Sequence, residues 1–143
     1  MAVHNLSVNL RASHPQGSRV SHDAFIGRLT IAGDDPIVDA TKSKSEWMAA
    51  LAVMVAIEIG EFTDAEEPSE AFVIALRERL VAAGDWLSRQ PIPVFDDIRA
   101  AGLECDVFVG GWIDCDQFDL DLPPNFLLAC GERGLEITIC TND

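Results

Sequence analysis

The chain is poor in positive charge. Of its 143 residues, 10 are Lys or Arg and 24 are Asp or Glu, which gives a net charge of −14 at pH 7. The imbalance lies in residues 45–143, where five arginines face twenty acids, whereas residues 1–44 are nearly neutral. Such a field repels nucleic acid and anionic membranes and attracts basic proteins. We therefore expect no nucleic-acid partner, and the composition favours a basic protein as the partner.

Long apolar runs and targeting signals are also missing. The longest uninterrupted apolar run covers residues 47–57, whereas a helix that spans a bilayer needs about 20 residues. The first ten residues, MAVHNLSVNL, lack the basic stretch and apolar core of a secretory signal. These absences predict a cytoplasmic protein without a membrane partner.

Patterns that hold metals or perform catalysis are not found either. No two cysteines have the short spacing of a zinc site, and the three histidines all lie in the first 22 residues. A Gly-x-Ser-x-Gly nucleophile motif is absent. We expect no metal, no cofactor and no catalytic residue, and in a reducing compartment the cysteines are expected to be buried or half-buried thiols. These are Cys105, Cys115, Cys130 and Cys140.

Alternating and continuous apolar patterns predict five strands. Their ranges are 6–10, 25–32, 105–113, 118–122 and 135–139. The strand at 105–113 is apolar on both faces, which predicts that both faces are covered. Residues 45–61 combine helix formers with a β-branched run; their length favours a helix, and a strand remains the alternative.

Helical spacing predicts three further segments. The clearest has an apolar stripe from Phe72 to Leu87, and the capping-box spacing of Thr63–Glu66 predicts where it begins. Shorter helices are expected at 95–101, before Gly102, and after Pro123-Pro124. The whole chain, residues 1–143, is then one α+β domain of order β-β-α-α-α-β-β-α-β, with a mainly antiparallel or mixed sheet packed against helices.

A group of acids in the C-terminal third is the strongest candidate for a site. Its members are Asp114, Asp116, Asp119 and Asp121. A calcium loop is disfavoured because its sixth position would be Asp119, where Gly is needed, and its twelfth position lacks Glu. In a strand, Asp119 and Asp121 point together away from the core. The group is therefore either a solvated strand face with its turn, or a contact surface for a basic partner.

The segment from Gly102 resembles an uncharacterised group of small acidic bacterial proteins. The resemblance covers residues 102–143 and rests on Gly-Leu-Glu-Cys-Asp-Val-Phe-Val-Gly-Gly-Trp-Ile-Asp, the later Leu-Pro-Pro, and Cys-Gly-Glu-Arg-Gly-Leu-Glu-Ile. Similar endings occur in domains suspected to be immunity proteins. The resemblance implies a bacterial origin and transfers no catalytic residue. We expect a non-enzymatic protein that binds a basic partner, for example a toxin. The alternative is a small enzyme or ligand-binding domain whose site is assembled only in the fold.

Overall fold

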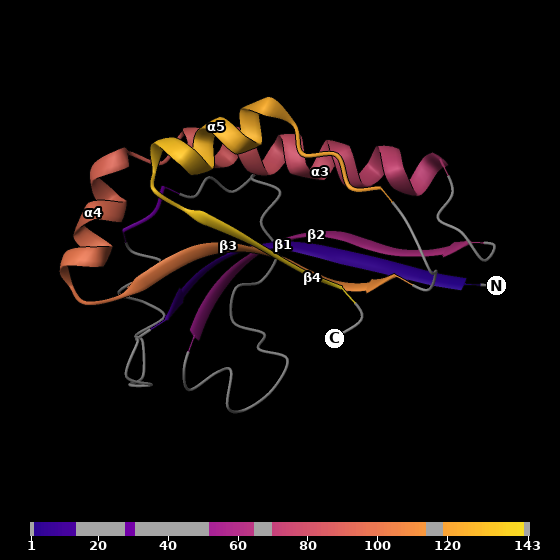
Figure 1. The fold of residues 1–143 in the computed structure, drawn as a ribbon, viewed down its shortest axis with the longest axis horizontal. Coiled ribbons are helices and arrows are strands. Elements are labelled where there is room, and N and C mark those ends of the chain that lie inside the picture. Colours follow the sequence, from indigo (N-terminus) through magenta and orange to yellow (C-terminus); the bar gives the residue numbers. More distant parts are fainter. Residues whose placement is uncertain (1, 14–27, 31–51, 65–69, 114–118, 142–143) are drawn as a thin grey trace.

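The computed structural model describes residues 2–13, 28–30, 52–64, 70–113 and 119–141. These residues form one mixed sheet, whose strand order is β2-β1-β3-β4, and the helices α3, α4 and α5 (Figure 1). The strands are β1 (Ala2–Ser13), β2 (Ala52–Asp64), β3 (Glu104–Ile113) and β4 (Glu136–Thr141). The helices are α3 (Glu70–Ser88), α4 (Ile92–Ala100) and α5 (Pro124–Glu132). The predicted α+β class, with a mixed sheet packed against helices, is confirmed.

Strand β1 lies at the centre of the sheet. It pairs antiparallel with β2 on one side and with β3 on the other, while β3 and β4 are parallel. Two parallel neighbours need a crossover connection, because the chain must return to the same end of the sheet. The connection between β3 and β4 contains α5, so the topology itself places this helix over the sheet.

The core lies between the sheet and one helical layer. Helices α3 and α5 lie along the same face of the sheet (Figure 1). The predicted stripe of α3 points into this layer, since Phe72, Leu76 and Leu80 are at most 2% exposed. It packs with side chains that alternate along β1 and β3 and with the inner face of α5. These are Val8, Leu10, Val107, Val109, Phe126 and Ala129.

The opposite face of the sheet carries an ion pair. Arg11 of β1 donates to both carboxylate oxygens of Asp106 of β3, at 2.8 and 2.5 Å, and its guanidinium lies 4.6 Å from the centre of the Phe108 ring. Thr138 donates to the same carboxylate at 3.2 Å. On this face Trp112 is 47% exposed. The prediction that both faces of β3 are covered is therefore wrong at Trp112, because α3 and α5 pack on the other face.

Residues 52–61 form a strand, so the preference for a helix at 45–61 is wrong over that part. The partners explain the outcome, because β2 pairs with β1 almost along its whole length, from Ala2↔Asp64 to Ser13↔Ala52. Thr63 and Asp64 belong to the same strand, so no helix begins at these residues. Tertiary pairing thus overrides two local helix signals. Residues 45–51, 65 and 66 lie outside the described residues.

Two shorter predicted strands also differ. Residues 28–30, the described part of the range 25–32, form a turn and a bend. The backbone N–H of Thr30 donates to the side-chain oxygen of Gln90 at 2.7 Å, and the side-chain amide of Gln90 donates to the carbonyl of Thr30 at 2.8 Å. These two bonds stand in place of those that a neighbouring strand would make. Residues 119–122, from the range 118–122, have no regular structure. Strand β4 occupies the position next to β3 in the sheet, so residues 119–122 do not pair there and lead into α5 instead.

Candidate functional site

Two of the four predicted acids can be placed. Asp119 and Asp121 are exposed in the irregular segment before α5, whereas Asp114 and Asp116 lie outside the described residues. Leu120 and Leu122 are half-buried and pack against the core. The predicted alternation is therefore correct at residues 119–122, although the segment is not a strand. The site must be considered together with α5, which follows directly.

Two prolines and a glycine fix the ends of α5. Pro123 precedes the helix with φ −64° and Pro124 occupies its first turn, where a missing N–H costs nothing. The helix ends at Glu132, and Gly134 then takes the left-handed conformation with φ 64°. The N–H of Leu135 donates to the carbonyl of Cys130 at 2.9 Å. The result is a short helix with a defined start and end.

Close contact with α3 sets which side of α5 faces inward. A Cβ atom on Gly84 of α3 would lie 2.8 Å from the backbone nitrogen of Phe126, so only glycine permits this approach. The amide of Asn125 donates to the carbonyl of Val81 at 3.0 Å and to the carboxylate of Asp85 at 3.1 Å. These contacts turn Phe126 into the core, where it is fully buried.

Arg133 secures the other end of α5 and is 5% exposed. Its guanidinium donates to the carbonyl oxygens of Ser88, Gln90 and Ala129, at 3.0, 3.0 and 3.1 Å. The carbonyl of Ser88 belongs to the last residue of α3, where carbonyls lack partners within the helix. Residues 119–141 contain no other Lys or Arg. The single cation of this segment is therefore used inside the protein.

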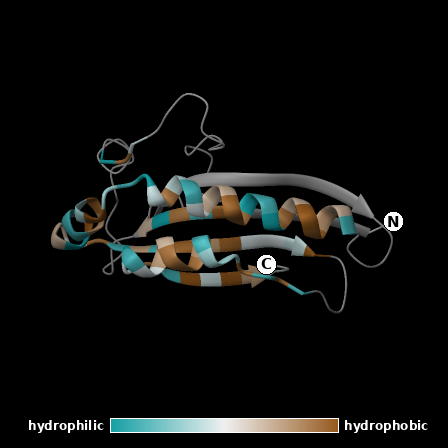
Figure 2. Cartoon of the chain, turned by 90° about the horizontal axis from the view of Figure 1, so that it is seen from above, coloured by the Kyte–Doolittle hydropathy of each residue, from teal (hydrophilic) through white to brown (hydrophobic). Residues whose placement is uncertain are grey.

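The outward side of α5 is apolar. Its exposed residues follow the spacing i, i+3, i+4, i+7 and i+8, so they form one stripe along the helix. Leu127 is 44% exposed and Leu128 is 62% exposed. Figure 2 looks onto the helical layer, in which α3 and α5 lie over the sheet. We call this set the outer stripe; it consists of Pro124, Leu127, Leu128, Gly131 and Glu132.

Acids lie before the outer stripe and at its last position, Glu132. Asp119 and Asp121 precede the helix, and Asp85 is bonded to Asn125 in its first turn. Glu132, in the last turn, has a side chain that is 48% exposed, and its carboxylate lies 3.6 Å from the guanidinium of Arg133. We call Asp85, Asp119, Asp121 and Glu132 the acidic rim. The arrangement is an apolar stripe bordered by negative charge, and the only cation of residues 119–141, Arg133, is buried.

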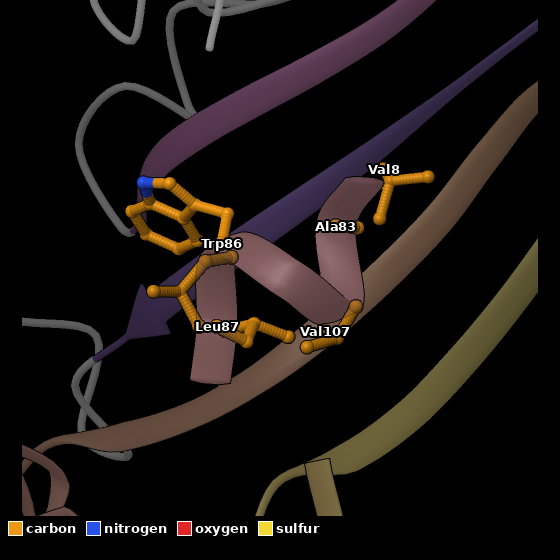
Figure 3. Close-up of a pocket in the computed structure, with 6 residues that line it drawn as sticks. Val8, Ala83, Trp86, Leu87 and Val107 are labelled. Atoms are coloured by element: carbon orange, nitrogen blue, oxygen red, sulfur yellow. The ribbon is translucent and has the colours of Figure 1, made fainter. Parts of the chain in front are cut away.

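A small hollow between α3 and the sheet offers little room for a ligand. It is lined by apolar side chains and measures about 10 Å³; ligand pockets usually measure about 300–1,000 Å³. Figure 3 shows Trp86 and Leu87 of α3 beside it. Trp86 is 1% exposed, and among the described residues its indole N–H has no hydrogen-bond partner. The hollow holds at most one water molecule. Its lining residues are Val8, Leu10, Ala83, Trp86, Leu87 and Val107.

Two cysteines, Cys105 and Cys130, are poor nucleophiles. Burial, with a smaller effect of the neighbouring Asp106, raises the pKa of the Cys105 thiol to about 12. Burial likewise raises the pKa of Cys130 to about 11, against the lowering effect of Arg133. Both thiols are protonated at neutral pH, whereas reactivity requires the thiolate. Among the described residues, no three His, Cys, Asp or Glu side chains gather as a metal site.

Sequence reasoning missed the outer stripe and the role of Arg133. In the helix predicted after Pro123-Pro124, Leu127 points outward, whereas Phe126, Ala129 and Cys130 are buried. The available signal was the run Phe-Leu-Leu-Ala-Cys, which makes a helix apolar on every side. A helix of that kind either is buried all round or presents an apolar face for contact.

Comparisons with family models, with curated proteins and with solved structures give no match to this chain. None of the helices among the described residues is long and apolar enough to cross a membrane. The functional argument therefore rests on the geometry and charge of the site itself.

Proposed function

We propose that this chain is a non-enzymatic bacterial protein of the cytoplasm that binds a basic protein, as an immunity protein binds a toxin, and that the acidic rim guides the partner. The observation that carries the proposal is the distribution of charge around α5. Asp119 and Asp121 are exposed, while Arg133 is buried. A cationic partner therefore meets no opposing positive charge from residues 119–141.

The acidic rim acts mainly on the rate of association. Complementary charge steers two proteins into encounter, and salt weakens this effect because exposed charges are screened over about 8–10 Å at physiological ionic strength. Exposed acids contribute little to folding stability. Their neutralisation is therefore expected to slow association without unfolding the protein.

The alternative function, a small enzyme or ligand-binding domain, receives less support from the described residues. The hollow beside Trp86 is too small for a substrate, and the Cys105 and Cys130 thiols are protonated at neutral pH. We therefore favour protein binding.

The test measures association of the purified partner, obtained by affinity capture from the source bacterium. The variant Asp119→Asn/Asp121→Asn is expected to associate several-fold more slowly than wild type at low salt, and the difference shrinks between about 50 and about 500 mM salt. The control Asp96→Asn/Asp97→Asn removes the same charge from exposed positions on α4. Equal association rates for both variants and wild type, independent of salt, would contradict the proposal.

A further inference from the structure

The outer stripe of α5 is not explained by the packing of the described residues. Leu127 and Leu128 point away from a core that the inner face of the helix already completes. Gly131 lies on the same stripe, and a Cβ atom there would have nothing within 4 Å. Glycine weakens a helix relative to alanine, and here no close contact requires it. Two exposed leucines beside a bare stretch of backbone form a surface on which another element can pack closely.

Resting on the proposed function, we propose that the outer stripe is the apolar anchor of the interface and that a cationic amphipathic helix of the partner packs on it. The charge of the surroundings selects this occupant. A second copy of the chain would bring its own acidic rim against this one, and like charges placed together oppose binding. Lysines or arginines at the edges of a partner helix would instead pair with Asp119 and Asp121, which are both exposed.

The dimensions of the stripe define the partner element. The stripe extends from Pro124 to Glu132, which corresponds to about 12 Å along the helix axis, or about two turns. A packed partner helix presents apolar side chains at i, i+3 or i+4, and i+7 over that distance. Its basic residues lie beside or just beyond these positions, opposite the acidic rim. Leu128 lies one turn from both Pro124 and Glu132, so it is the central anchor.

The test uses two synthetic peptides of identical Leu and Lys composition. One is an amphipathic helix, and the other is permuted so that its leucines form no stripe. We expect the full chain to bind the amphipathic peptide more tightly in a fluorescence anisotropy titration at physiological salt. Leu128→Asn is expected to weaken this binding by at least about tenfold, as for the loss of a central anchor, without any change of charge.

A matched control is available on α3. Ile74 is 50% exposed and lies outside the outer stripe, so Ile74→Asn removes a similar exposed side chain at another place. This variant is expected to bind the amphipathic peptide within about twofold of wild type, because distant surface positions contribute little to an interface. The thermal unfolding of both variants is measured, because the comparison requires that both are folded.

The outcomes separate this inference from the proposed function. If Leu128→Asn binds the amphipathic peptide like wild type while Asp119→Asn/Asp121→Asn still slows the native partner, the anchor is wrong and the proposed function stands. If neither variant changes any association, both are wrong. Sedimentation of the chain as a dimer that Leu128→Asn dissociates would overturn the inference in favour of a second copy.

Discussion

Replacing Gly84 with alanine tests the contact that orients α5. The new Cβ atom would lie 2.7 Å from the side-chain nitrogen of Asn125 and 2.8 Å from both Cα and the backbone nitrogen of Phe126. Ordinary van der Waals contact begins at 3.4 Å. The side chain of Asn125 can move aside, but the backbone of Phe126 moves only with the helix. Helix α5 must therefore shift away from α3.

The magnitude follows from two opposing effects. Overpacking a well-packed contact costs about 1–3 kcal/mol. Replacing glycine by alanine inside a helix contributes about 0.5–1 kcal/mol in the opposite direction. The steric effect is the larger one because two of the three close atoms are backbone atoms, so we expect Gly84→Ala to lower the free energy of unfolding by about 1–2 kcal/mol.

Gly131→Ala is the matched control, because it makes the same chemical change on the other helix at a position with open space. It is expected to leave the free energy of unfolding unchanged or to raise it by up to about 1 kcal/mol. Both variants are compared with wild type by denaturant unfolding. Adding Asn125→Ala to Gly84→Ala is expected to give no rescue, because the backbone contacts remain. A Gly84→Ala protein as stable as Gly131→Ala would refute the close approach of the two helices.

Two further predictions concern buried polar groups. Arg133→Met keeps the apolar stem but removes the donors to the carbonyls of Ser88, Gln90 and Ala129. It is expected to lower the free energy of unfolding by about 2–4 kcal/mol. A loss below about 0.5 kcal/mol in denaturant unfolding would contradict this role of Arg133. The second prediction concerns pH. As the pH rises above 9.0, the unfolded chain releases thiol protons that the folded chain keeps, because burial raises the pKa of Cys105 to about 12 and of Cys130 to about 11. The stability contributed by these thiols is therefore fully present below about pH 9 and decreases between about pH 9 and 12. Tyrosine does not titrate in the same range, since the chain contains none. Unfolding free energies measured at pH 8 to 10 are expected to decrease less for Cys105→Ala/Cys130→Ala than for wild type, and equal slopes would show that these thiols are not the cause.

Sequence periodicity predicted those elements in which local pattern and tertiary packing agree. The Phe72–Leu87 stripe, the strand at 105–113 and the helix after Pro124 are all present. The closing strand is present too, as β4. Each has a regular apolar pattern and one clear position against the core, so a local signal suffices. The exposure of Asp119 and Asp121 is predictable for the same reason, because it follows from their alternation with Leu120 and Leu122.

Elements whose structure depends on distant partners were not predicted. Residues 52–64 become a strand because β1, far away in the sequence, pairs with them. Thr30 lies 60 residues from Gln90, whose side-chain amide nevertheless binds its backbone. Arg133 reaches Ser88 and Gln90 over 45 and 43 residues. Such hydrogen bonds between a side chain and a distant backbone group produce no periodic pattern in the sequence, so composition and spacing do not predict them.

The orientation of α5 links these structural contacts to the candidate site. Periodicity left the orientation of this helix undecided, since both of its sides carry apolar residues. Three contacts decide it: the close approach at Gly84, the bonds of Asn125 to α3, and the burial of Arg133. The same three contacts turn Leu128 outward, and Arg133, buried at the end of α5 and paired with Glu132, adds no exposed positive charge beside Asp119 and Asp121. The residues that seat the helix therefore also determine the apolar and electrostatic character of the surface it presents.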